Sequence, residues 1–298
     1  MTKREEGGAS EASGLRGTAP GMASIAAGMA LAATLWASQA SAARVDTPYP
    51  GAAWPDNESH APKVSNNGAC VAYVSAATNL VDGMAGEGSG VYLYTLSTGQ
   101  LRRLSQLGTG ERVQGLAVSS DCSRVVWTSV GLGVSAAGTL TRWRAEEAAS
   151  EDLVLPLLDP NGDGRADLTA RYQALAMAAD TGVLALSVLY DSGAGLVEEA
   201  VLFDPETGGQ TTLPFVFQEA DLSSAGGVLA FTGAEALVAA DTNGETDVYA
   251  YERASGALSL ISADRSGRSG GGSSGSPSVS DDGRYVLFDT EAADLVAG

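Results

Sequence analysis

Residues 221–262 read DLSSAGGVLAFTGAEALVAADTNGETDVYAYERASGALSLIS, and residues 277–298, PSVSDDGRYVLFDTEAADLVAG, follow the first part of that pattern. Each copy contains a short apolar segment, a turn with Gly, a second apolar segment and an A-x-x-LV step. Apolar and polar residues alternate within these segments, which is typical of half-buried β-strands. The two stretches therefore predict a repeated unit of antiparallel strands.

The same unit recurs from Val64 onward, and its second strand is the easiest part to follow. The matching segments are CVAYVS, RVVWTS, GVLALS, GVLAFT and RYVLFD. Four strands in each unit, at the spacing of propeller blades, predict an all-β fold, a β-propeller of four-stranded blades. We expect four blades at about 64–108, 114–158, 172–214 and 219–263, and a partial fifth at 276–298. An open β-sandwich would not explain the recurrence of one four-strand unit.

Two stretches also resemble the TolB-like, or WD40-like (PD40), bacterial propeller repeats. They are Ser276–Val296, SPSVSDDGRYVLFDTEAADLV, and Leu237–Ser262, LVAADTNGETDVYAYERASGALSLIS. VAYVSAATNLVDG in the first unit is similar, whereas the second and third units lack the DGR turn and the NLV-DTN step. The resemblance implies a ring of six or seven blades. We therefore expect either that the sequence is a fragment of a longer protein or that residues 44–63 supply closing strands.

The N-terminal residues have the pattern of an export signal. Lys3, Arg4 and Arg16 precede the apolar run at residues 21–36, and ASQASAA follows with small residues suited to cleavage. The run is shorter than the roughly 20 residues of a membrane-spanning helix. We predict a signal peptide at residues 1–42, with an uncleaved anchor as the alternative, and a linker or closing strand at residues 43–63. After removal of the signal we expect no membrane span and a periplasmic or extracellular protein.

The chain is strongly acidic, with 36 Asp and Glu against 17 Lys and Arg and a net charge of −19. Such a chain is repelled by phosphate backbones, so we expect no nucleic-acid partner. The two cysteines, Cys70 and Cys122, lie near the same turn of consecutive units. In an oxidising compartment they can form a disulfide, and two separate thiols are the alternative.

One loop, LLDPNGDGRADLTARY, has the spacing of a calcium-binding loop. Asp159, Asn161, Asp163 and Asp167 occupy positions 1, 3, 5 and 9, and the Arg165 carbonyl oxygen is expected at position 7. Position 12 is Ala170 instead of the Glu of an EF-hand, so we expect a calcium loop of a different kind. The alternative is a turn held by Asx side chains.

A second acidic loop, DTNGETD, contains Asp241, Asn243, Glu245 and Asp247. Its spacing is similar to that of the first loop, but it joins two strands and lacks the later Gly. For this loop we favour the Asx-turn interpretation, in which the side chains bond to the backbone.

The sequence offers little for catalysis, so we expect a protein that is not an enzyme. His60 is the single histidine, and a Ser-His-Asp triad would have to use it. GGSSG, residues 271–275, fits G-x-S-x-G around Ser273 only formally, because it lies in a Ser/Gly-rich loop. We expect an exported module that binds a protein or cell-envelope ligand. The alternative is the propeller part of a secreted prolyl-oligopeptidase-like hydrolase or of a lyase, whose catalytic region lies outside this sequence.

Overall fold

The computed structural model describes residues 45–46, 55–81, 89–132, 137–162, 164 and 166–296. The chain divides into two units, Met1–Arg44 and Val45–Gly298, and all described residues belong to the second. The predicted signal peptide therefore lies outside the described residues. Among those residues, no helix is both long enough and apolar enough to cross a membrane.

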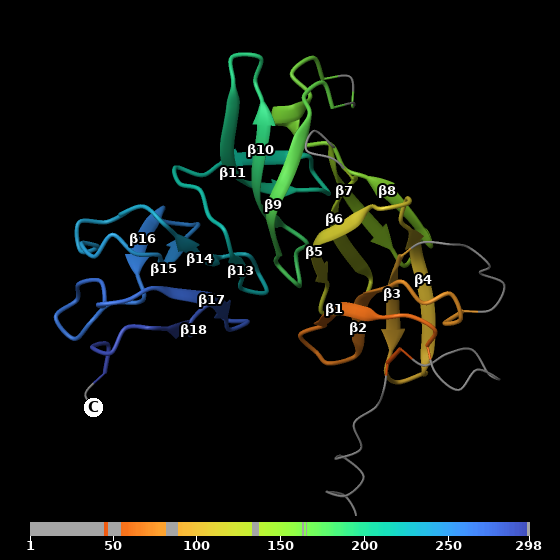
Figure 1. Ribbon diagram of the computed structural model, residues 1–298, viewed down its shortest axis with the longest axis horizontal. Helices are drawn as coiled ribbons and strands as arrows, with labels where there is room; N and C mark the ends of the chain where they lie inside the picture. The colour runs from red at the N-terminus through yellow and green to blue at the C-terminus, as the bar shows by residue number, and fades with distance from the viewer. Residues whose placement is uncertain are drawn as a thin grey trace, which may run out of the picture. The chain divides into compact units, whose positions relative to one another are not determined.

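Strands make up nearly all the regular structure of the described residues, and Figure 1 shows them as successive small sheets. The first two sheets contain β1 (Ser59–Val64), β2 (Cys70–Ser75), β3 (Gly90–Thr95), β4 (Gln100–Gln106), β5 (Arg112–Val118), β6 (Arg124–Val130), β7 (Gly138–Arg144) and β8 (Ala149–Asp152). The next two contain β9 (Ala170–Met177), β10 (Leu184–Asp191), β11 (Leu196–Asp204), β12 (Gly209–Thr212), β13 (Ala220–Leu222), β14 (Val228–Gly233), β15 (Asp247–Glu252) and β16 (Ala257–Leu260). The last sheet pairs β17 (Ser274–Val279) with β18 (Val286–Thr290).

Each of the four complete sheets is an antiparallel meander whose strands pair in chain order. The order is β1-β2-β3-β4, and the three following sheets repeat it. This is the arrangement that the sequence predicts for propeller blades, and it confirms the all-β fold of four blades and a partial fifth. We call β1, β5, β9, β13 and β17 the inner strands.

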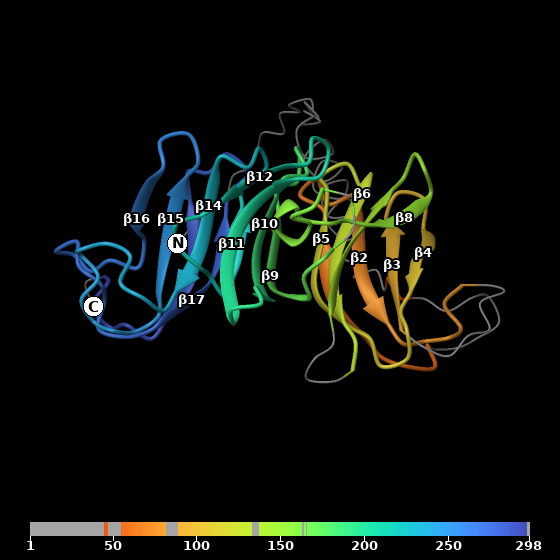
Figure 2. The same ribbon diagram turned by 90° about the horizontal axis from the view of Figure 1, so that it is seen from above.

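Apolar cores lie between the first and second, the second and third, and the third and fourth sheets, which pack face to face (Figure 2). In β6 the side chains of Val125 and Trp127 join a core shared with the first sheet, and Val126 joins a core shared with the third. In β10, Leu184 and Leu186 face the second sheet, whereas Ala185 packs with the fourth. Because side chains alternate along a strand, one apolar strand contributes to two interfaces.

The turn between the first and second strands has the same hydrogen bonds in each blade. The residue that follows the inner strand donates its N–H to the carbonyl oxygen five residues later, as in Ser65 to Cys70 at 3.0 Å and Ser223 to Val228 at 3.0 Å. The Ser223 hydroxyl also accepts the N–H of Val228 at 3.0 Å. Gly226 takes a φ of 74° in this turn, a left-handed conformation that favours glycine.

These turns are also bonded to one another, and we call them together the turn belt. Ser120 donates its N–H to the oxygen of Ala179 at 2.9 Å, and Asp180 donates to Ser224 at 2.9 Å. Ser224 in turn donates to Asp281 at 3.1 Å. The Asn66 amide donates to Asp281 Oδ1 at 2.5 Å, so the first turn also contacts the fifth.

A disulfide joins the first two turns of the belt. Cys70 and Cys122 are bonded, with their Cα atoms 6.2 Å apart. Cys122 has a φ of 62°, at the position where the first and fourth turns have Gly68 and Gly226. The structure thus selects the disulfide over two separate thiols.

Two elements differ from the strand pattern expected from the sequence. The second blade was expected to extend to about residue 158, but its last strand, β8, ends at Asp152, and Pro156–Leu158 form a 3-10 helix. Pro156 has no N–H for a strand ladder, and Leu155 and Leu158 are buried in the core instead. At the other end, β1 lies within the segment expected as a linker or closing strand, and it contains Pro62 at a bulge between His60 and Lys63.

Candidate functional site

The inner strands line a connected space that we call the inner cavity. One part has a volume of about 370 Å³ and another about 460 Å³, and both are lined by residues of all five inner strands or their ends. The two parts share Lys63, Leu116, Leu175 and Ala220. Successive residues of one inner strand line this space, such as Leu116, Ala117 and Val118 of β5, because the inner edge of each sheet borders it. The fold thus brings side chains of distant sequence segments to one place.

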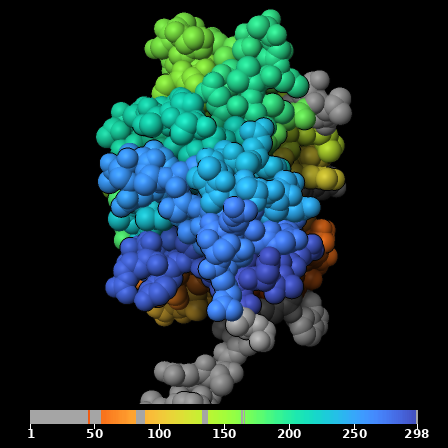
Figure 3. Space-filling model, turned by 90° about the vertical axis from the view of Figure 1, so that its left-hand side faces the viewer, coloured from red at the N-terminus to blue at the C-terminus, as the bar shows by residue number. Residues whose placement is uncertain are grey.

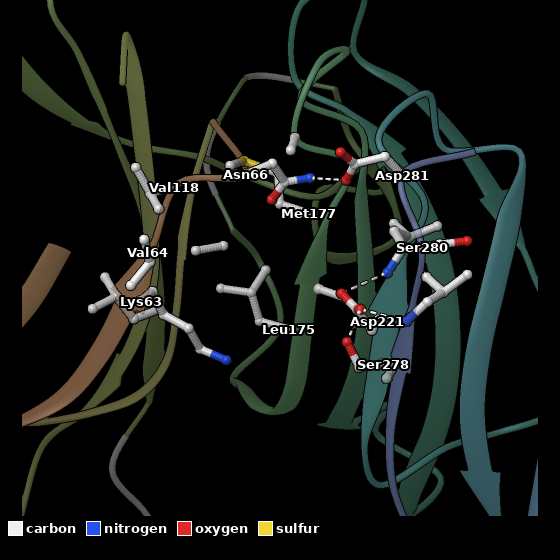
Figure 4. Close-up of a pocket in the computed structure, with 17 residues that line it drawn as sticks. Lys63, Val64, Asn66, Val118, Leu175, Met177, Asp221, Ser278, Ser280 and Asp281 are labelled. Atoms are coloured by element: carbon white, nitrogen blue, oxygen red, sulfur yellow. Dashed lines mark hydrogen bonds between the residues drawn. The ribbon is translucent and has the colours of Figure 1, made fainter. Parts of the chain in front are cut away.

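Charged side chains face the cavity from opposite walls (Figure 4). Lys63 extends from β1, while Asp221 lies on β13 across the space from it. No ion pair of the described residues includes Lys63, although the chain has a net charge of −19. The cavity therefore contains a cationic group that is accessible to a ligand carboxylate.

The carboxylates on the opposite wall hold the last inner strand. Asp221 Oδ2 accepts the Val279 N–H at 2.8 Å and the Ser278 hydroxyl at 3.2 Å. Glu219 Oε2 accepts the Ser276 N–H at 2.8 Å. Charged acceptors make stronger hydrogen bonds than neutral ones, so these two side chains attach β17 to the fourth blade. Figure 3 shows the C-terminal residues, in dark blue, beside the fourth blade.

Three glutamines line the second part of the inner cavity. Gln114, Gln173 and Gln218 lie at or next to β5, β9 and β13, and all three side chains are exposed. An amide group both donates and accepts hydrogen bonds. The three amides and the Lys63 ammonium therefore give the cavity the means to bind the main chain of an extended peptide.

The apolar pattern of the repeat does not indicate these glutamines, although a signal for them exists. Each stands five residues before the residue that follows its inner strand, at Ser119, Ala178 and Ser223. An alignment of the repeats on that residue places the three glutamines in one column. The signal is thus a polar residue at a constant position, which is separate from the apolar residues that define the repeat.

The loop predicted to bind calcium is described only in part, since Asp163 and Arg165 lie outside the described residues. Asp159 accepts the N–H of Gly162 at 2.9 Å and that of Gly164 at 2.8 Å, through its two carboxylate oxygens. The Asn161 amide donates to Asp167 Oδ1 at 3.1 Å. An Asx turn makes such contacts, and the remaining lone pairs of a carboxylate can still bind a cation.

The residues considered for catalysis are not arranged as a triad within the described chain. His60 lies on β1, whereas the Ser273 hydroxyl donates to Glu245 Oε2 at 2.9 Å. Ser273 precedes a strand, β17, and not a helix. A nucleophile elbow requires a strand-to-helix turn and a nearby base, so this serine has neither feature.

No family model matches the chain, and no curated protein matches it. Among solved structures, TolB from Acinetobacter baumannii is 16% identical, with a TM-score of 0.46 over 80% of this chain and 52% of TolB. A putative TolB from Agrobacterium tumefaciens is 12% identical, with a TM-score of 0.46 over 81% and 73% of the two chains. The β-propeller domain of the Trilobed protease from Pyrococcus furiosus is 12% identical, with a TM-score of 0.49 over 80% and 71%.

The chain thus spans about half the length of TolB from Acinetobacter baumannii. The likenesses are of fold, and no activity or partner follows from them at these identities. The chain is similar to these propellers, and its own four-stranded, face-packed sheets make it an all-β propeller.

Proposed function

We propose that this protein is an exported, non-catalytic propeller that binds a protein of the cell envelope through the inner cavity. The observation that carries the proposal is the convergence of Lys63, Gln114, Gln173 and Gln218 on one cavity. Convergent polar groups in a cavity lined by apolar side chains are typical of binding sites. A rigid sheet scaffold holds such groups in place without further ordering cost.

An extended peptide segment is the ligand that fits these groups best. Its main-chain N–H and C=O groups pair with glutamine amides, which can serve as donor and acceptor. Lys63 would bind a carboxylate of the peptide, either a side chain or the chain terminus. The carboxylates of Glu219 and Asp221 are already bonded to β17, so they would contribute less to the ligand.

The disulfide supports the proposed export. Disulfides persist in oxidising compartments and are rare in the cytosol, so Cys70–Cys122 fits a periplasmic or extracellular location. With the signal at residues 1–42, the mature chain would begin at Ala43. N-terminal sequencing and cell fractionation test this proposal, and an unprocessed cytosolic chain would contradict it.

Calcium at residues 159–167 belongs to the same proposal. Asp159, Asn161, Asp163 and Asp167 would supply side-chain oxygens, and Arg165 its carbonyl oxygen, which are the hard ligands that Ca²⁺ takes. The ion would stiffen the loop that precedes β9. Calorimetric titration of the full chain with Ca²⁺ should give heat that Asp163→Ala reduces, whereas equal heats from both proteins would remove this ion from the proposal.

Site-specific photo-cross-linking tests the binding function. A photoreactive residue at Gln173, in the inner cavity, should yield a discrete adduct in cells that express the full chain. The matched control places the same residue at Glu146, an exposed position in the turn between β7 and β8. Lys63→Glu should weaken the adduct at Gln173. Identical adducts at both positions, or none at Gln173, would contradict an inner-cavity partner.

A further inference from the structure

Two aspartates of the 241–247 loop are buried, and each has one oxygen without a hydrogen-bond partner. Asp241 is 6% exposed and Asp247 is 0% exposed. The unpartnered atoms are Asp241 Oδ1 and Asp247 Oδ2. In the described part of the chain these are the buried carboxylate oxygens that lack a partner. A buried polar atom without a partner is costly, so a native fold rarely keeps two together unless something binds them.

The other oxygen of each aspartate is fixed by a neighbouring hydroxyl. Tyr249 on β15 donates its hydroxyl to Asp241 Oδ2. Ser262 donates its hydroxyl to Asp247 Oδ1 at 2.5 Å and accepts the Val248 N–H at 3.0 Å. These bonds orient both carboxylates and leave the second oxygen of each one free.

The two carboxylates also interact with each other. Burial raises the pKa of Asp247, hydrogen bonds with Ser262 and Asn243 lower it, and the neighbouring Asp241 carboxyl raises it again. Neither aspartate belongs to an ion pair of the described residues. Two like charges in a buried site repel each other and lose hydration, so either a proton or a cation must neutralise the pair.

We propose that Asp241 and Asp247 bind Ca²⁺ between their two unpartnered oxygens, at a site separate from residues 159–167. Oxygen-bearing side chains alternate along the loop at Asp241, Asn243, Glu245 and Asp247, which suits a hard cation. The described chain has no group of three or more His, Cys, Asp or Glu placed for a metal, so the proposed site has two carboxylate ligands. Water and main-chain carbonyl oxygens complete its coordination, and the affinity falls in the weak extracellular range, with a Kd of about 10⁻⁴–10⁻³ M.

The ion would stabilise the connection between the fourth blade and β17. Ser269 Oγ accepts the N–H of Thr242 at 2.8 Å and that of Asn243 at 3.2 Å. The Asn243 amide donates to the Gly270 oxygen at 2.8 Å. The 241–247 loop is thus bonded to the segment that leads into β17, and a cation on the loop would order both. The Asx turn expected from the sequence is present as well, since Asn243 Oδ1 accepts the Glu245 N–H at 2.9 Å.

The test uses the full chain in the Asp163→Ala background, which removes the first loop as a calcium site. Thermal unfolding is measured with and without saturating Ca²⁺, and the ion should raise the Tm by about 2–4 °C. In the same background, Tb³⁺ in place of Ca²⁺ should give tyrosine-sensitised luminescence, because the Tyr249 hydroxyl contacts Asp241. Asp247→Asn and Asp241→Asn should each abolish the Tm shift and most of the luminescence.

An unchanged Tm in the Asp163→Ala background would overturn the proposal, and this result needs no variant of the pair to fold. A Ca²⁺-dependent rise in Tm that persists in both asparagine variants would also overturn the proposal, because the ion would then bind elsewhere. If Ca²⁺ has no effect and Asp247→Asn is more stable than the parent, the pair shares a proton instead. Failure of the photo-cross-linking at Gln173 would leave this ion site unaffected.

Discussion

The Asp121 side chain shows how one carboxylate fixes a turn of the belt. Its Oδ1 accepts the Ser119 hydroxyl at 2.7 Å, the Ser123 hydroxyl at 2.7 Å and the Ser123 N–H at 2.9 Å. Partial burial raises the pKa of Asp121, but these hydrogen bonds from Ser123 and Ser119 outweigh it and lower the pKa from 3.8 to about 2. The folded turn therefore favours the ionised form more than the unfolded chain does.

The lowered pKa of Asp121 predicts that the wild type and Asp121→Asn differ in unfolding free energy by an amount that depends on pH. Asp121 contributes stability above pH 3.8, and the contribution is lost as the pH falls from 3.8 toward 2. Asp121→Asn keeps an acceptor oxygen but does not titrate. Urea unfolding of both proteins across this range should show the wild type more stable above pH 5, with the difference shrinking as acid is added. A difference that does not change with pH would contradict the assignment.

At the scale of single residues, the sequence predicts turns better than it predicts unpaired atoms. An Asx turn was the favoured interpretation of the 241–247 loop and the alternative at Asp159, and both loops contain the bonds of such turns. The burial of Asp247 could not be anticipated, because it depends on contacts such as that of Ser262, 15 residues later, with the first residue of β15. Burial is a property of the neighbours, which a local spacing rule does not contain.

Side chains contribute to the position of β17. It pairs with β18, and Asp221 and Glu219 of the fourth blade accept its N–H groups beside a backbone bond from Ser274 to Thr246. Hydrogen bonds to a charged acceptor contribute about 1.5–3 kcal/mol each. A change at Asp221 should therefore loosen β17 and β18 while the third blade keeps its stability.

Asp221→Ala should increase amide hydrogen exchange across residues 274–290 by roughly 10–100-fold, the equivalent of one or two lost charged hydrogen bonds. The measurement is hydrogen–deuterium exchange with mass spectrometry, and peptides from β9 and β10 serve as the internal reference. Glu146→Ala, an exposed change in another blade, is the matched control and should leave exchange unchanged. Equal protection of 274–290 in both variants would show that Asp221 does not hold β17.

The disulfide gives a second prediction for the blades. Its cysteines are separated by 52 residues, for which loop-closure entropy predicts about 4 kcal/mol of stabilisation. Guanidinium unfolding with a reductant should therefore give a lower midpoint than without it. The double variant Cys70→Ala with Cys122→Gly, which suits the left-handed φ at residue 122, should not respond to the reductant. A lower midpoint of the double variant in reductant would show that the effect does not come from this disulfide.

The second and third strands of the blades were predictable because they are rich in apolar residues, as in β2 and β6. β8 was misplaced because the apolar residues that follow it, LVLPL, fit a strand by composition, whereas Pro156 lacks the N–H of a strand ladder. β1 was not expected as a regular strand because Pro62 lies within it, and a proline in a strand usually marks an edge or bulge. Both cases show a backbone constraint competing with the apolar pattern.

At the scale of the whole molecule, the net charge of −19 is the dominant electrostatic property. Acidic residues outnumber basic ones by 36 to 17, and the described ion pairs engage few of them. Self-repulsion of this kind destabilises a compact fold, and salt screens it within a Debye length of about 8 Å at physiological ionic strength.

Sodium chloride should therefore raise the Tm between low and physiological ionic strength, with the effect flattening at higher salt. Scanning calorimetry at neutral pH measures this, and choline chloride distinguishes screening from specific cation binding. The same rise with both salts is expected for screening. A rise with sodium only would indicate bound ions instead, and a fall with both would contradict net repulsion.

The propeller fold could be predicted from the sequence because one four-strand unit recurs along the chain. The inner cavity could not, because it is assembled from single residues of five strands that lie far apart in sequence. Lys63, Gln114 and Gln173 come together only when the sheets are stacked. The repeated apolar residues therefore predict the scaffold. The binding groups can be found only when the polar positions of the copies are compared.

The bond between Cys70 and Cys122 also changes how the molecule would respond to mechanical tension. A pull on the two ends passes through the sulfur atoms and bypasses residues 71–121. At roughly 3.5 Å per residue, the oxidised protein would stretch about 180 Å less than the reduced one in an optical trap. Tension on the mature protein would therefore not extend β3 and β4 of the first blade, which lie within the disulfide loop, whereas β1 lies outside it.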